Sequence, residues 1–277
     1  IVMISPSATS PALSTLEDNG LFFRTSPSDA RQGEVMTDEI MERGIKSVAV
    51  TYTNNDYGKG LADSFAAAFE AKGGKVTINA AHDDGKADYA AEVGALASAG
   101  GDALVIAGYV DQGGSGILRG ALDTGAFSTF VFPDGMVGEV LEKNFGPEIN
   151  GSFGQIPSSE GAGKEKFIEL AKAAGFDGSS VYSGEAYDAA ALMLLAMQAA
   201  NSTDPAVYKE KIMEIANGPG EKILPGELGK GLELLAAGQD IDYDGASSVE
   251  LIGAGESAGT FREIEIKDGK IETVKYR

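Results

Sequence analysis

The feature that most constrains the fold is a regular alternation of short apolar segments with amphipathic segments, beginning at Gly44. Residues 45–52 have the composition of a buried strand, and residues 58–72 place apolar residues on one helical face before two glycines end the helix. The same cycle repeats, and we predict strands at 75–79, 103–107 and 129–132 and helices at 87–99, 115–124 and 136–144. Strands and helices alternating at these lengths form parallel sheets through crossover connections. The sequence therefore predicts a doubly wound α/β layer.

A second series of elements follows this layer. Helices are predicted at 163–174, 183–200 and 205–217, the last capped by Ser202, Thr203 or Asp204. Residues 260–266 and 270–276 form a predicted hairpin around an Asp-Gly turn. A chain of 277 residues, 43% of them hydrophobic, is long enough to bury two cores. We therefore expect two lobes.

Composition excludes several classes of function. The 22 Lys and Arg residues against 42 Asp and Glu residues give a net charge of -20, which disfavours binding to nucleic acid. The absence of cysteine excludes disulfides and thiolate metal sites. The most apolar stretch, 186–200, is short and interrupted by Asp188 and Gln198, so we expect no direct insertion into a membrane.

Four short segments follow predicted strands, and ligands of open α/β sheets bind at such strand ends. The first is the serine-rich turn Ser5–Ser10, which comes directly after a predicted strand at 1–4; the others are 53–57, 108–112 and 133–135. Together they provide hydroxyls, exposed backbone N–H groups, two tyrosines and a carboxylate in the otherwise apolar FPDG turn, which suits a small zwitterion. The serine-rich turn is also compatible with an ordinary turn that caps the next helix.

Other chemistries have little support. His82 is the only histidine, and we predict it to be a solvated surface residue in a charged loop. No Ser-His nucleophile pair, dinucleotide fingerprint or phosphate-loop motif is evident. Residues 240–250 place three aspartates and a glycine as a calcium loop would, but the closing glutamate is one residue early and the flanking helices are missing. We expect this loop to be a solvated crossover between the lobes, without metal.

Five segments carry a family likeness: ISPSATSPALS, VAVTYTNNDYGKGLADSF, VFPDGMVGEVLE, YSGEAYDAAALMLLAMQAA and LGKGLELLAAGQDIDYDGASSVEL. In this order and spacing the chain resembles the type I periplasmic binding proteins of branched-chain (Leu/Ile/Val) amino-acid ABC transporters. The resemblance implies two doubly wound α/β lobes with the ligand in the interlobe cleft. The first lobe is expected to comprise 1–28 plus 157–240 and the second 29–156 plus 241–277.

The resemblance also implies roles for individual residues. The turn formed by Ser7, Ala8 and Thr9 is expected to bind the ligand carboxylate, and Asp134 to neutralise its ammonium. Tyr57 is expected to close over the ligand from the second lobe. The ligand side chain is expected to lie by Tyr182 and by Tyr109 or Val110. Because the family often has Glu at the Asp134 position, the shorter Asp can meet the ammonium differently, for example through water.

The implied function is a solute-binding component of an ABC importer that captures an amino acid and delivers it to a membrane permease. It would be periplasmic, or lipid-anchored outside the cytoplasm, monomeric at full length, and without catalysis, cofactor or metal. An alternative is the ligand-sensing module of a receptor or regulator with the same fold. The family's first βα units have no counterpart here, so we expect the sequence to be part of a longer precursor. Leu, Ile, Val, an aromatic amino acid and a small amide remain candidate ligands.

Overall fold

The computed structural model describes residues 1–277 and contains two compact units. Unit 1 comprises Ile1–Ser28 and Pro157–Thr260, and unit 2 comprises Asp29–Ile156 and Phe261–Arg277. Both contain parallel strands and helices, which confirms the predicted α/β class. None of the helices combines the length and apolar character needed to cross a membrane.

One predicted boundary differs from the structure. Residues 241–260, expected in the second lobe, belong to unit 1. The reason is pairing: β9 (Ile241–Tyr243) lies parallel to β8 (Glu221–Ile223), so this segment joins the unit that contains β8. The predicted crossover between lobes at 240–250 is therefore wrong, and the chain leaves unit 1 only after Thr260.

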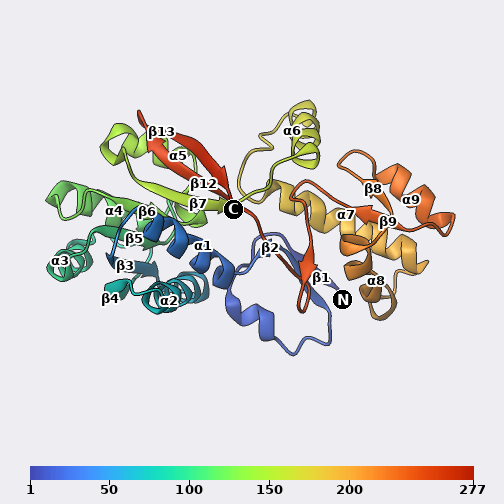
Figure 1. Cartoon of the computed structure of the whole chain (residues 1–277), viewed down its shortest axis with the longest axis horizontal. Coiled ribbons are helices and arrows are strands. Elements are labelled where there is room, and N and C mark those ends of the chain that lie inside the picture. The colour runs from blue at the N-terminus through green and yellow to red at the C-terminus, as the bar shows by residue number, and fades with distance from the viewer. The chain divides into compact units, whose positions relative to one another are not determined.

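Unit 2 is built on a seven-stranded sheet with the order β13-β12-β7-β6-β5-β3-β4 (Figure 1). Its strands are β3 (Ser47–Thr53), β4 (Lys75–His82), β5 (Ala103–Ala107), β6 (Phe130–Phe132), β7 (Phe153–Pro157), β12 (Phe261–Lys267) and β13 (Lys270–Tyr276). The pairs among β3 to β6, and β6 with β7, are parallel, whereas β12 and β13 form the predicted antiparallel hairpin. Asp268 and Gly269 both have positive φ, as a two-residue type I′ turn requires.

Five helices accompany this sheet: α1 (Asp29–Glu42), α2 (Asp56–Ala71), α3 (Ala90–Ala99), α4 (Gly113–Thr124) and α5 (Glu139–Phe145). Helices α1 and α2 pack together against one face, where Phe65 and Phe69 bury fully beside Val50 and Val105. Because side chains alternate along a strand, neighbouring residues such as Leu104 point to the opposite face. The sheet is thus buried on both faces, as its continuous apolar strands predict.

Unit 1 contains a four-stranded sheet with the order β1-β2-β11-β10 and the separate β8-β9 pair. The four strands are β1 (Met3–Ser5), β2 (Phe22–Pro27), β10 (Leu251–Ile252) and β11 (Glu256–Ser257). Its helices are the 3-10 helix η1 (Pro11–Thr15), α6 (Ala162–Ala174), α7 (Ser183–Ala200), α8 (Pro205–Asn217) and α9 (Leu228–Ala236). The core forms where α7, through Leu192 and Leu195, meets α8 and the strands.

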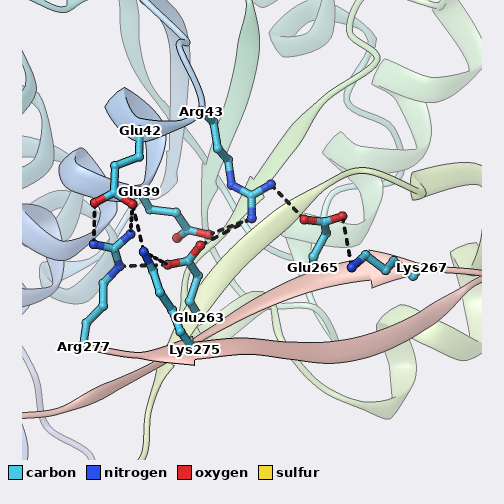
Figure 2. A network of polar contacts seen from close by, with 8 residues as sticks. All are labelled: Glu39, Glu42, Arg43, Glu263, Glu265, Lys267, Lys275 and Arg277. Carbon is cyan, nitrogen blue, oxygen red and sulfur yellow. Dashed lines mark hydrogen bonds and ion pairs between the residues drawn. The ribbon is translucent and has the colours of Figure 1, made fainter.

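An ionic network connects α1 to the β12-β13 hairpin within unit 2 (Figure 2). Glu39 lies in the last turns of α1 and Arg43 directly after it, while Glu263 lies on β12 and Arg277 directly after β13. Arg277 Nε lies 2.8 Å from Glu263, and its Nη atoms bind Glu42. Glu39 is fully buried, and its nearest cation, Arg43, is 3.7 Å away.

Candidate functional site

The serine-rich turn follows β1 in unit 1, as the sequence predicts. The Ser5 hydroxyl oxygen accepts hydrogen bonds from the backbone N–H of Ala8 at 3.0 Å and of Ser7 at 3.4 Å. Ser7 is exposed, Ala8 half-buried and Thr9 buried. Ser10 precedes η1 but makes no capping hydrogen bond with its side chain. The turn is therefore shaped by its own first hydroxyl, and its polar groups do not cap the following helix.

The buried side chain of Arg24, from β2, holds this turn in place. Its Nη1 donates to the carbonyl oxygens of Ala8 at 3.1 Å and of Ser10 at 2.9 Å. Its Nη2 donates to the Ser14 hydroxyl at 2.8 Å and forms an ion pair with Glu256 of β11. Arg24 is 1% exposed, so a full positive charge lies under the turn. Sequence analysis missed it, because Arg24 stands between Phe23 and Thr25 while its partners Ser14 and Glu256 come from other parts of the chain.

The start of α7 carries Tyr182 and a second carboxyl group that the sequence did not single out. Tyr182 is half-buried, with left-handed backbone at φ 65°. Three residues on, the Glu185 side chain is buried, and burial raises its pKa to about 7. The Glu185 carbonyl accepts a 2.8 Å hydrogen bond from the Thr25 hydroxyl, which joins α7 to β2. Unit 1 thus combines backbone donors, a buried cation and a carboxyl group that exchanges its proton near neutral pH.

In unit 2, the structure brings Tyr57, Tyr109 and Asp134 together. The Tyr57 hydroxyl donates to Asp134 Oδ1 at 3.0 Å and accepts from the Gly135 N–H at 3.2 Å. The rings of Tyr57 and Tyr109 stack with centroids 5.1 Å apart. Asn55, which caps α2, donates to the Tyr109 hydroxyl at 3.5 Å. Three strand-end segments therefore converge on one buried carboxylate, as expected where parallel strands end at the same edge.

The electrostatics of this group favour a cation. Asp134 is 6% exposed. Burial and the negative charge of Asp134 raise the pKa of Tyr57 well above its usual value, so Tyr57 stays a hydroxyl donor. Val110 contributes its backbone N–H, which donates to the Gly135 carbonyl at 2.9 Å and fixes the two loops to each other. The half-buried Tyr109 and Val110 leave both alternatives for the side-chain contact open.

The prediction for His82 is wrong. Strand β4 continues to His82, which pairs with Thr53 of β3 and is only 1% exposed. The Thr51 hydroxyl lies 2.9 Å from its Nδ1, and the ring meets the edge of Tyr89. Burial lowers the pKa of His82, so the imidazole is neutral at neutral pH. The charged residues that follow His82 suggested a loop, but the strand ends three residues later than its apolar pattern indicates.

The acidic loop at 240–250 also has a structural role. Asp188 of α7 accepts hydrogen bonds at 2.7 Å from the Tyr243 hydroxyl, the Ala246 N–H and the Ser247 N–H, and at 2.6 Å from the Ser247 hydroxyl. Asp244 forms an ion pair with Lys222. No cluster of three or more His, Cys, Asp or Glu side chains is arranged to hold a metal ion. The loop binds α7 through Asp188, which the sequence did not predict.

Comparison with known proteins gives a family match over most of the chain. A family model described as "Periplasmic binding protein" matches residues 1–216. A leucine-, isoleucine-, valine-, threonine- and alanine-binding protein of Pseudomonas aeruginosa is 30% identical over 77% of this chain and 57% of its own length. A chemotactic signal transduction system substrate-binding protein of Halobacterium salinarum is 28% identical over 98% of this chain and 65% of its own length. The chain thus spans about three fifths of the length of these curated relatives.

Solved structures support the same fold. The structure of a leucine-binding protein from Thermotoga maritima matches with a TM-score of 0.81. The match covers 100% of this chain and 73% of that one, at 22% sequence identity. At this identity the likeness establishes the fold alone.

Proposed function

The chain belongs to the periplasmic binding protein family, with branched-chain amino-acid binding proteins among its relatives, and from that premise we propose that it binds a small amino acid for an ABC importer. The ligand carboxylate would be held by the turn Ser7, Ala8 and Thr9 of unit 1. Its ammonium would be held by Asp134 of unit 2. The ligand side chain would lie by Tyr182 and by Tyr109 or Val110, with Tyr57 positioning Asp134.

The strongest support for this proposal is that the residues of unit 1 and the residues of unit 2 favour ligand groups of opposite charge. In unit 1 the Ser7 and Ala8 N–H groups already donate to the Ser5 hydroxyl, which leaves the Thr9 N–H, in the turn over the buried Arg24, as the backbone donor for an anion. Unit 2 offers a buried carboxylate whose Oδ1 is oriented by the Tyr57 hydroxyl, which favours a cation. An amino acid carries both charges. A set built for a simple carboxylate or a simple amine would not need both.

The wider role follows from the family. We propose that the protein is extracytoplasmic, delivers its ligand to a membrane permease, and releases it chemically unchanged. What supports this last point is that the only histidine, His82, pairs with the Thr51 hydroxyl inside the sheet, where both residues are buried and out of reach of a ligand. We propose that the full-length protein is monomeric.

Calorimetric titration with L-leucine tests the proposal. Asp134→Asn keeps the shape of the side chain but removes its charge, and we expect it to weaken binding by about 2–4 kcal/mol. Asp123→Asn is the matched control, because Asp123 is a largely exposed carboxylate of the same unit whose nearest ion pair, to Arg119, is 3.7 Å long. An affinity that Asp134→Asn leaves unchanged would exclude Asp134 as the ammonium ligand.

A second candidate function is ligand sensing, which the Halobacterium salinarum relative favours because its name assigns it to chemotactic signal transduction. The two functions use the same ligand site and differ in the partner. Genes for a permease and an ATPase beside the coding sequence would support import. A neighbouring transducer gene, and capture of that transducer by the ligand-loaded protein, would support sensing.

A further inference from the structure

Arg24 is the largest fully buried side chain of the protein, and both Nη atoms of its guanidinium make polar contacts. It lies on β2, two residues from Ser26, and its guanidinium reaches across to the serine-rich turn that follows β1. One nitrogen binds the carbonyl oxygens of Ala8 and Ser10, and the other binds Ser14 and Glu256. One charged group therefore fixes the second half of the turn, at Ala8 and Ser10.

The trans geometry of the Ala8–Thr9 peptide determines the direction in which the Thr9 N–H points. The Ala8–Thr9 peptide is trans, and in a trans peptide the C=O and N–H bonds point in opposite directions. The Ala8 oxygen is bound by Arg24 at 3.1 Å and by the Ser26 hydroxyl at 3.3 Å. The Thr9 N–H must consequently point away from the guanidinium. A cation on the carbonyl also polarises the peptide and makes its N–H a stronger donor.

The countercharge shows that Arg24 does not itself bind the anion. Glu256 forms an ion pair with it, and the Ser14 hydroxyl donates to Glu256 at 2.5 Å while accepting from Arg24. With 1% exposure, the guanidinium has no free face for a ligand. Its influence on an anion must pass through the backbone of the turn.

We propose that Arg24 is a positioning residue that orients the Ala8–Thr9 peptide so that its N–H, that of Thr9, binds the carboxylate of the ligand. This rests on the function proposed above, because it assumes that the turn receives a carboxylate. It adds the residue on which carboxylate recognition depends.

The test compares two ligands in three forms of the protein by calorimetry. L-leucine carries the carboxylate, and L-leucinamide replaces it with a neutral amide of similar shape. Arg24→Lys keeps the charge, but one ammonium cannot span both carbonyls, Ser14 and Glu256. Glu256→Gln is the matched control, since it leaves the Arg24 contacts to Ala8 and Ser10 available.

We expect Arg24→Lys to weaken L-leucine binding by about tenfold or more, and L-leucinamide binding by less than about twofold. Glu256→Gln should change the ratio of the two affinities little.

A purely structural role of Arg24 would lower both affinities equally, and that result would overturn the inference, as would an unchanged L-leucine affinity. If Arg24→Lys does not fold, the double variant Arg24→Gln with Glu256→Gln leaves no unpaired buried charge, and the same ratio is measured on it. Failure of the wild type to bind L-leucine or any other amino acid would instead reject the proposed function. The wild-type titration therefore separates the two failures.

Discussion

The two units differ in how they accommodate buried polar side chains. In unit 1, the buried Asp188 accepts four hydrogen bonds, and the buried Arg24 donates to two carbonyls, a hydroxyl and a carboxylate. In unit 2, by contrast, the carboxyl oxygens of the buried Glu39 have no hydrogen-bond partner. Burying a charge is costly unless hydrogen bonds and opposite charges compensate it. Around Arg24 and Asp188 hydrogen bonds provide this compensation, and the two side chains hold loops in place. In unit 2, Glu39 avoids the cost by remaining protonated.

The consequence for Glu39 is a strong dependence on pH. Burial, and then the negative charge of Glu263, raise its pKa to about 9, against the opposing effect of Arg43, Arg277 and Lys275. Glu39 lies at one end of the ionic network, where its contact is with Arg43 at 3.7 Å (Figure 2). Arg24 and Asp188 of unit 1 therefore fix backbone geometry through hydrogen bonds, whereas Glu39 of unit 2 is a buried group that ionises only in alkali.

The largest effect is expected from removing the acceptor in unit 1. Asp188→Ala leaves the Tyr243 hydroxyl and two backbone N–H groups without their partner, and we expect it to lower the free energy of unfolding of unit 1 by about 3–5 kcal/mol. Denaturant unfolding followed by circular dichroism measures this. Ser247→Ala, which removes one of the four donors, should cost about 1 kcal/mol. Equal and small losses in both variants would contradict the role given to Asp188.

A second test uses pH to act on unit 2. A group whose folded pKa is raised stabilises the protein fully below its unfolded pKa, and this contribution is lost as pH rises through the folded pKa. Between pH 7 and pH 9, therefore, Glu39 should reduce stability by up to about 1.4 kcal/mol per pH unit. The buried Glu185 of unit 1, with a pKa of about 7, has lost its own contribution by then.

Glu39→Gln replaces the protonated carboxyl with a neutral group of the same shape, so stability should become nearly independent of pH over that interval. Glu185→Gln is the comparison, because it should change the profile below pH 7 and leave the interval above it unaltered. Melting temperatures of the wild type and both variants, measured across this pH range, test the expectation. A wild-type profile that is already flat between pH 7 and pH 9 would show that Glu39 is ionised in the folded protein.

The smallest effect is expected at the exposed edge of the same network. Hydrogen bonds from Arg277 and Lys275 lower the pKa of Glu42 to about 2, so its stabilising contribution is lost only as pH falls from about 4.5 toward that value. Since Glu42 is about half exposed, solvent and salt screen its ion pairs. Glu42→Gln should change the melting temperature only slightly at neutral pH, and the change should vanish at high salt. A change that persists at high salt would mean that Glu42 is less screened than its exposure indicates.

The elements that sequence predicts best are those whose ends carry local signals. The bounds of α7, α8 and β5 are as predicted, and Asp204 caps α8 as one of the three proposed residues. By contrast, β2 and α1 were missed. Both bury polar residues, among them Arg24, Thr25 and Glu39, which disrupt the apolar period on which such predictions depend. Arg24 pairs with Glu256, 232 residues away in sequence, and Arg43, directly after α1, pairs with Glu263, 220 residues away, so no local pattern indicates these contacts.

The candidate site shows the same limit. The convergence of Tyr57, Tyr109 and Asp134 follows from strand ends and could be predicted. The support of the turn by Arg24 could not, because it depends on β2 lying beside β1. His82 shows the reverse error, where a charged sequence neighbourhood hid a buried residue.

The central claim is that the protein recognises both charges of an amino acid, an anion at the turn of unit 1 and a cation at Asp134 of unit 2. Calorimetric titration of the wild type with L-leucine, 4-methylpentanoate and 3-methylbutylamine tests it most directly, because the second ligand lacks the ammonium and the third lacks the carboxylate. We expect each analogue to bind at least about a hundredfold more weakly than L-leucine, since either loss leaves a buried polar group uncompensated. Binding of 4-methylpentanoate or 3-methylbutylamine as tight as that of L-leucine would contradict the account.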